Sequence, residues 1–173
     1  MLFEELKIKG VYLISLAPHE DERGFFARSF CEKEFREAGV CSHFVQCNMS
    51  YNIKKGTLRG MHYQVYPNEE IKLVSCIRGA IFDVALDLRV NSPTRGQWLS
   101  VELTEKNHQM LYIPEGIAHG FQSLVDETMV YYQMSEFYHP EAARCVSYND
   151  AKYNIIWPIA EKIISARDMM PYE

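Results

Sequence analysis

The segment 55–64, Lys-Gly-Thr-Leu-Arg-Gly-Met-His-Tyr-Gln, places an arginine, a histidine, a tyrosine and an amide in one strand-length run. A strand that only fills a β core reads as alternating aliphatic residues, so this run indicates a binding or catalytic site. Arg59 could bind an anion, and His62 could act as a base near neutral pH. A second histidine, His119, lies in the segment 113–121. The two segments together predict one polar site in an aromatic-rich β protein.

Spacing alone leaves three roles for His62: a hydrogen-bonded core histidine, a metal ligand or a general base. Metal-binding β barrels usually supply a His-x-His pair with further ligands, whereas this chain reads His62-Tyr63-Gln64. His119 alone cannot complete such a set, so we expect no metal and no other cofactor. A histidine base needs a carboxylate to orient its ring, and Asp168 could serve if the C-terminus folds back.

Lys72 and a tyrosine pair are further candidates for the site. Lys72 lies in an apolar run and shares a face with Val74 and Cys76, which favours a side chain that points into a cavity. Tyr131 and Tyr132 are adjacent, so alternation turns only one phenol inward, where it could donate a proton. On spacing alone, either tyrosine is more typical of a core aromatic.

Arg23 and Arg59 each precede a glycine, which lets an anionic ligand approach the backbone closely. Taken alone, either arginine is more typical of a surface salt bridge. Strict alternation also places Arg59 and His62 on opposite faces of their strand. A bulge at Gly60, or a contribution to the site of a neighbouring subunit, would remove this conflict.

The elements that position these groups belong to an ordered globular chain. Its 173 residues, with 47% hydrophobic and 24% charged, predict a single domain spanning 1–173. A net charge of −5 gives no general attraction to nucleic acid. No apolar stretch approaches the about 20 residues that cross a bilayer, and the N-terminus lacks the basic start of a signal peptide. We therefore expect a cytoplasmic location, with neither a nucleic acid nor a membrane as partner.

The five cysteines are irregularly spaced and include no Cys-x-x-Cys pair, so we expect reduced thiols. Short β-type runs recur about every ten residues, with turn signals between them. We expect strands at 11–17, 43–51, 56–64, 70–77, 80–88, 97–103, 109–113, 119–125, 128–138 and 153–157. A helix is expected over 32–38, ended by Gly39, with a helical turn from Ser165. Many strands and few short helices predict an all-β sandwich or barrel of the jelly-roll type.

Alternation within 80–88 places Asp83 and Asp87 on one face of their strand. That face is either solvated or part of a polar barrel mouth, and the sequence favours neither alternative.

Eight segments, taken in order, resemble one known family, the dTDP-4-dehydrorhamnose 3,5-epimerases. They are 21–26, 46–50, 56–64, 83–89, 92–94, 113–121, 149–150 and 157–158. The resemblance covers nearly the whole chain. It implies a metal-independent cupin-type jelly roll that forms a homodimer by exchange of N-terminal strands. It also implies an isomerase of deoxysugar biosynthesis, as in lipopolysaccharide O-antigen pathways, whose substrate is a nucleotide-diphosphate sugar.

The resemblance also implies a role for individual residues. His62 matches the base, Asp168 its dyad partner, Tyr132 the acid on the opposite face, and Lys72 the group beside the 4-keto oxygen. The residues that match those holding the nucleotide diphosphate and the sugar are Arg23, Gln46, Asn48, Arg59 and His119. Tyr138 matches an aromatic ring that stacks on the nucleobase. A C4 ketone acidifies the hydrogens at C3 and C5, because their removal gives an enolate.

Three positions depart from the family pattern: Arg28 and Ala143 stand where glutamate is common, and Arg167 where lysine is common. We expect Arg28 and Arg167 at the substrate, and the charge change at 28 leaves dTDP, CDP and GDP as alternative nucleotides. The sequence also leaves open whether C3 alone or both C3 and C5 are inverted. A ketoisomerase is disfavoured because it moves a proton on one face, and a non-catalytic sugar-nucleotide-binding cupin would not need the proton-transfer set.

Overall fold

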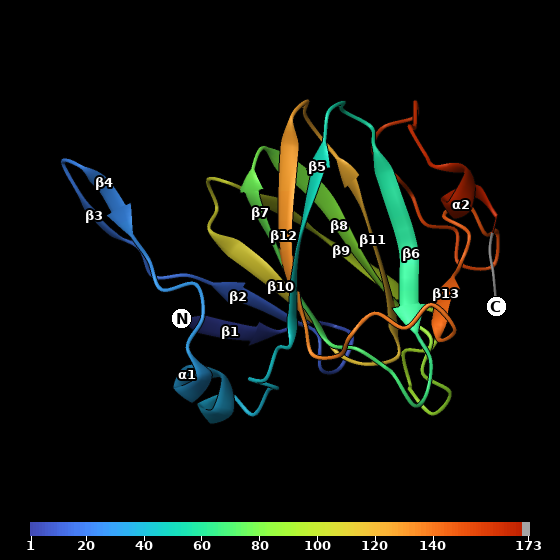
Figure 1. The fold of residues 1–173 in the computed structure, drawn as a ribbon, viewed down its shortest axis with the longest axis horizontal. Coiled ribbons are helices and arrows are strands. Elements are labelled where there is room, and N and C mark those ends of the chain that lie inside the picture. The colour runs from blue at the N-terminus through green and yellow to red at the C-terminus, as the bar shows by residue number, and fades with distance from the viewer. Residues whose placement is uncertain (171–173) are drawn as a thin grey trace.

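The computed structural model describes residues 1–170, which form two facing antiparallel sheets, a separate two-stranded hairpin and two short helices (Figure 1). The six-stranded sheet contains, in spatial order, β1 (Leu2–Glu5), β2 (Tyr12–Ser15), β10 (Gln109–Ile113), β7 (Lys72–Arg78), β12 (Thr128–Met134) and β5 (Gln46–Asn52). The five-stranded sheet contains β13 (Ala143–Cys145), β6 (Leu58–Gln64), β11 (Ile117–Ser123), β8 (Ala80–Asp87) and β9 (Trp98–Thr104). This arrangement confirms the predicted all-β jelly-roll architecture.

The main core lies between the two sheets. Val74 and Val130 from the six-stranded sheet pack with Ile81, Leu103 and Phe121 from the other, all nearly inaccessible to solvent. Burying a side chain of this size contributes about 1.5–3 kcal/mol relative to exposure. The two facing sheets therefore form a rigid frame around any site that opens between them.

The outer face of the five-stranded sheet is covered by the segment after β13. Ile155 and Trp157 pack on Leu58, Met61 and Leu86 of that sheet. The strand expected at 153–157 is therefore wrong. Its apolar residues cover a sheet face instead of pairing with an edge, and the Trp157 indole N–H donates to the carbonyl of residue 148 at 2.9 Å.

The other expected strands are present, with ends displaced by a few residues. The elements that alternation missed have three or four residues: β1, β13 and the hairpin of β3 (His19–Asp21) and β4 (Gly24–Phe26). Such short strands contain too few residues to show a period. The helices α1 (Glu32–Glu37) and α2 (Ala166–Met169) lie where a helix and a helical turn were expected.

The outer face of the six-stranded sheet is covered only in part. Phe35 of α1 packs over β2, β7 and β10. On the outer face of β5 and β7, Met49, Tyr51 and Ile77 remain 72%, 45% and 48% exposed. The β3–β4 hairpin projects away from both sheets (Figure 1). The chain therefore leaves part of one apolar sheet face exposed to solvent, and its β3–β4 hairpin packs on neither sheet.

Asp87 is fully buried at the end of β8, so it does not lie on a solvated face. Arg89, Ser92 and Thr94 donate hydrogen bonds to its carboxylate. Burial alone would raise the pKa of Asp87, but these bonds lower it to about 2. All five cysteines are free thiols, as expected. Within residues 1–170, no helix has the length and apolar character needed to cross a membrane.

Candidate active site

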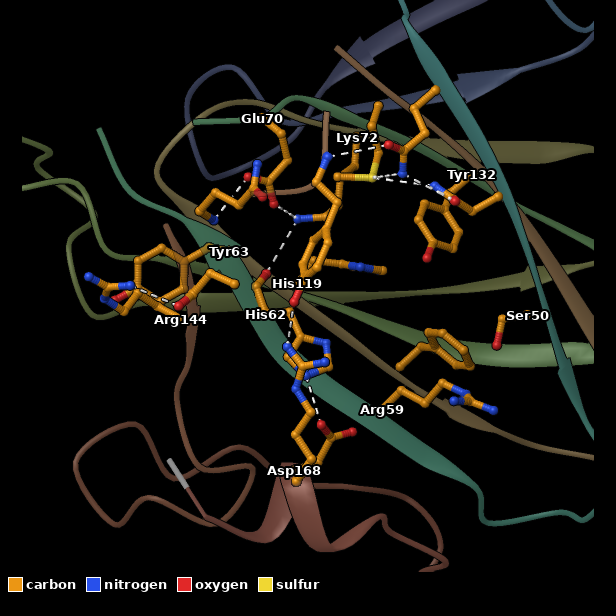
Figure 2. A pocket seen from close by; sticks show the side chains of 18 of the residues that line it. Ser50, Arg59, His62, Tyr63, Glu70, Lys72, His119, Tyr132, Arg144 and Asp168 are labelled. Carbon is orange, nitrogen blue, oxygen red and sulfur yellow. Dashed lines mark hydrogen bonds and ion pairs between the residues drawn. The ribbon is translucent and has the colours of Figure 1, made fainter. Parts of the chain in front are cut away.

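A pocket of about 620 Å³ opens between the two sheets and extends to α2 (Figure 2). Its volume lies in the range of small-molecule sites, which is about 300–1,000 Å³. Most of the predicted site residues line it: Gln46, Asn48, Arg59, His62, Lys72, His119, Tyr132, Tyr138, Arg167 and Asp168. The fold thus gathers these side chains from six elements and the loop that follows β12 into one cavity.

A bulge in β6 turns Arg59 and His62 into the same pocket. His62 pairs with His119 and Arg59 with Phe121, so β6 uses one residue more than β11 over this stretch. Gly60 lies at the bulge with φ +122°, and a Cβ there would lie 2.5 Å from the Cα of Gly120. Only glycine fits this close approach. The predicted bulge is confirmed.

His62 and Asp168 form a hydrogen-bonded dyad, with Nε2 of the ring 2.8 Å from Oδ1 of the carboxylate (Figure 2). Ser165 caps α2 by accepting a hydrogen bond from the backbone N–H of Asp168, which fixes the position of this residue. The C-terminus therefore folds back as the dyad requires. Burial would raise the pKa of Asp168, but the bond and charge of His62 and the N–H of Gly60 hold it below its ordinary value.

Lys72 points into the pocket from β7 and is only 7% exposed, which confirms its predicted orientation. Its ammonium group forms an ion pair with Glu70 and donates to the backbone carbonyl of His62 at 3.4 Å. Glu70 also accepts a hydrogen bond from the backbone N–H of Gln64 at 2.9 Å. Sequence reasoning missed Glu70, although its i, i+2 spacing from Lys72 placed both on one face.

Tyr132 lines the pocket from β12, whereas the neighbouring Tyr131 does not, as alternation predicted. Burial raises the pKa of Tyr132 above its ordinary value, and the nearby charge of Arg59 partly offsets this effect. A phenol with a raised pKa is protonated at neutral pH and can donate a proton.

A second histidine–carboxylate pair joins His119, which lines the pocket, to Asp83, which lies behind it. His119 Nε2 is 2.7 Å from Oδ1 of Asp83, and Asp83 is fully buried. The solvated alternative for Asp83 is therefore wrong. The other oxygen of Asp83 and the hydroxyl of Ser50 are buried without a hydrogen-bond partner among residues 1–170. Both groups lack the partners that buried polar atoms normally have. Ser50 lines the pocket, so its hydroxyl is available to a ligand.

The polar groups at the mouth of the pocket hold one another in place. The Gln46 amide donates to Asn48 at 3.2 Å and accepts from the backbone N–H of Tyr138 at 3.3 Å. Arg167 donates to the Tyr138 hydroxyl at 2.8 Å, and Arg59 donates to Asn52 at 2.9 Å. Two guanidinium groups therefore line a cavity that also contains amides and an aromatic ring, a combination suited to an anionic ligand.

Arg23 and Arg28 do not line the pocket of their own chain. Arg23 lies at the turn of the β3–β4 hairpin and pairs with Asp21, while Arg28 donates to Glu34 at 2.8 Å. The hairpin carries Arg23 away from the sheets (Figure 1). The expectation that both contact the substrate is not met within a single chain.

Cys145 lies beside the dyad and was missed from sequence. It is directly opposite His62 in the ladder between β13 and β6, and it is 2% exposed. Burial and the negative charge of Asp168 raise the pKa of its thiol to about 11. The only signal for this contact was the pairing of a three-residue strand, which alternation does not detect.

Comparison with known proteins assigns this chain to a protein family. The sequence profile of the dTDP-4-dehydrorhamnose 3,5-epimerases matches residues 5–172. The chain belongs to this family. A relative of that name from Shigella flexneri is 46% identical over 150 residues, which are 86% of this chain and 82% of the relative.

Solved structures of family members are similar over nearly the whole chain. The Bacillus anthracis dTDP-4-dehydrorhamnose 3,5-epimerase with TDP and PPi bound has a TM-score of 0.96 and 38% identity, covering 99% of this chain and 98% of that one. The Legionella pneumophila dTDP-6-deoxy-D-glucose-3,5-epimerase in complex with dTDP-4-keto-L-rhamnose has a TM-score of 0.91 and 40% identity, covering 96% and 89%. These findings confirm the resemblance of the eight segments to an isomerase family of deoxysugar biosynthesis.

Proposed function

We propose that the protein inverts C3 and C5 of a nucleotide-linked 4-keto-6-deoxyhexose, with dTDP as the nucleotide. One observation carries this proposal: the His62–Asp168 dyad and the Tyr132 phenol line one pocket from facing sheets. A sugar held between the sheets would present one face to each group. Inversion of a carbon centre requires removal of a proton on one face and delivery on the other.

In the proposed reaction, Nδ1 of His62 removes the proton from C3 or C5, since Nε2 is bonded to Asp168. The buried carboxylate of Asp168 stabilises the imidazolium that forms. The electron pair of the broken C–H bond moves into an enolate, whose oxygen the ammonium group of Lys72 stabilises. Tyr132 then delivers its phenolic proton to the opposite face of the same carbon.

The remaining pocket groups fit the rest of the substrate. Arg59 and Arg167 offer guanidinium groups to the diphosphate, and His119 offers a ring nitrogen. Gln46 and Asn48 would also contact the sugar or the diphosphate, and the ring of Tyr138 would stack on the nucleobase. The TDP and dTDP-sugar bound to the relatives support dTDP as the nucleotide. A CDP- or GDP-linked sugar remains the alternative, because Ala143 supplies no charged group to the pocket.

We propose that the protein acts as a homodimer in which the β3–β4 hairpin reaches the partner's pocket. The uncovered face with Met49, Tyr51 and Ile77 supplies an apolar surface for a second copy. The hairpin points away from its own sheets and carries Arg23 at its turn, so this arginine would complete the phosphate-binding set of the other subunit.

Solvent exchange tests the proposed reaction. The protein is incubated in D₂O with the dTDP-, CDP- or GDP-linked 4-keto-6-deoxyglucose, and deuterium at C3 and C5 is measured by mass spectrometry and NMR. We expect deuterium at both carbons with the dTDP-sugar. Deuterium at C3 alone would identify a 3-epimerase. Faster exchange of the CDP- or GDP-linked sugar would show that the substrate carries that nucleotide and not dTDP. The absence of exchange with every sugar would leave a binding protein without this activity.

A further inference from the structure

We infer that Cys145, His62 and Asp168 form a site for a thiophilic divalent metal ion such as Zn²⁺, and that an ion bound there blocks His62. One ligand atom of each residue lies within 4.8 Å of the other two. Cys145 and Asp168 are 2% and 5% exposed, so the donors belong to a buried cluster and are not scattered surface groups. The inhibition rests on the proposed function, whereas the metal site does not.

Three separate elements fix the cluster. Cys145 of β13 is the direct antiparallel partner of His62 of β6, and such partners direct their side chains to the same face about 5 Å apart. Asp168 approaches from α2, where Ser165 caps the first turn. Because each donor belongs to a different backbone segment, the cluster is a property of the fold and not of one flexible loop.

The donor set matches the coordination chemistry of zinc. A thiolate, an imidazole nitrogen and a carboxylate oxygen are its ordinary protein ligands, with bonds of about 2.0–2.3 Å. A tetrahedral ion with such bonds separates its donors by about 3.5 Å. The Nε2–Oδ1 contact, now 2.8 Å, would open slightly, and the sulfur would move inward. The His62 side chain is 39% exposed toward the pocket, which gives an ion a path of entry and leaves a fourth position for water.

Proton balance explains the inhibition. The ion displaces the thiol proton of Cys145 to solvent, because a coordinating thiol is deprotonated. It also replaces the proton on Nε2 of His62, and the neutral ring takes up one proton on Nδ1. Nδ1 then has no free electron pair with which to accept a substrate proton. Each bound ion therefore releases one net proton and removes the base.

Cobalt tests the site without reference to activity. The full-length protein is titrated with Co²⁺, whose bond to a thiolate gives a charge-transfer absorption in the near ultraviolet. We expect this band in the parent protein and in the control Cys47→Ser, which removes an exposed thiol. We expect its loss in Cys145→Ser and Cys145→Ala, and its displacement by Zn²⁺. Absence of the band from the parent protein, or an unchanged band in both Cys145 variants, would overturn the site.

Zn²⁺ inhibition of deuterium exchange tests the consequence, with each variant compared with its own rate in EDTA. We expect reversible inhibition of the parent protein and of Cys47→Ser, with Cys145→Ser requiring at least about tenfold more Zn²⁺. Equal sensitivity of the parent protein and Cys145→Ser would contradict the inhibitory role. A Cys145-dependent cobalt band in a protein that exchanges no sugar nucleotide would retain the metal site and remove the proposed function.

Discussion

At the scale of single residues, the chemistry of the pocket depends on buried partners. Lys72 and His119 are each paired with a buried carboxylate, Glu70 and Asp83 respectively. The sequence predicted both basic residues as site residues, because their types match the family pattern. It did not predict their partners or the proximity of Cys145, because these depend on cross-strand register and on side-chain burial.

The Lys72–Glu70 pair should separate stability from catalysis. We expect Lys72→Met to destabilise the protein by about 3–5 kcal/mol, because it leaves the Glu70 carboxylate buried without its cation. The double variant Lys72→Met/Glu70→Gln should recover most of this stability in urea unfolding.

Exchange activity should not recover in the double variant, since the group that stabilises the enolate is still missing. We expect a loss of about 10²–10³-fold in the exchange rate for both variants. Recovery of exchange together with stability would show that Lys72 has only a structural role.

At the scale of elements, the longer strands followed from alternation, whereas the short elements did not. The run 109–113 predicted β10 with its observed bounds, because five consecutive residues suffice to show a strand. β13 and the β3–β4 hairpin were missed, since three residues show no period. The bulge in β6 was predicted only because the chemistry of Arg59 and His62 conflicted with strict alternation.

The bulge at Gly60 should tolerate no side chain. Gly60→Ala places a Cβ 2.5 Å from the Cα of Gly120, at a φ that L-residues rarely adopt. We expect a loss of about 3 kcal/mol or more in urea unfolding, with loss of exchange activity. Gly24→Ala is the matched control: its φ is +123°, but no atom lies within 4 Å of the added Cβ. Equal destabilisation of both variants would show that backbone strain, and not the close approach, requires Gly60.

Asp87 should make stability depend on pH in the acid range. Its pKa is lower in the folded state, about 2, than the ordinary value of 3.8, so its contribution is present above pH 3.8 and disappears as the pH falls toward 2. Asp87→Asn should therefore cost about 2 kcal/mol at neutral pH, and the difference from the parent protein should shrink below about pH 4.

Urea unfolding between neutral pH and about pH 2.5 checks this expectation. Asp126→Asn, at an exposed carboxylate, should change stability far less and serves as control. A constant difference between Asp87→Asn and the parent protein across this range would contradict the linkage.

At the scale of the whole molecule, the family resemblance carried the function, because its segments overlap the pocket strands β5, β6 and β11. Lys72, Tyr132 and Asp168 also line the pocket but lie outside those segments. The uncovered sheet face and the direction of the hairpin could not be predicted, because they depend on the arrangement of the finished sheets. The single domain over 1–173 and the cytoplasmic location stay predictions.

Subunit mixing tests the exchanged hairpin. Arg23→Ala and His62→Ala should each have little activity, but a denatured and refolded mixture should recover about a quarter of the parent rate. Half of the dimers would then hold one complete site, built from His62 of one subunit and Arg23 of the other. A mixture no more active than its two components would contradict the proposal that the hairpin reaches the pocket of the partner subunit.

The surface for the partner copy is tested by size-exclusion chromatography with light scattering. Met49→Glu should give monomers, because it places a charge on the uncovered sheet face. Val90→Glu, at an equally exposed apolar residue outside that face, should leave the dimer intact. Identical masses for both variants would contradict the assigned surface.

The central claim is that His62 and Tyr132 act on opposite faces of one carbon, and Tyr132→Phe tests it most directly. The measurement is the ratio of deuterium incorporation to inversion at C3 and C5, followed by NMR in D₂O. We predict that His62→Ala abolishes both, whereas Tyr132→Phe retains exchange while inversion falls by at least about 10²-fold. Equal loss of exchange and inversion in Tyr132→Phe would contradict the division of roles between the two residues.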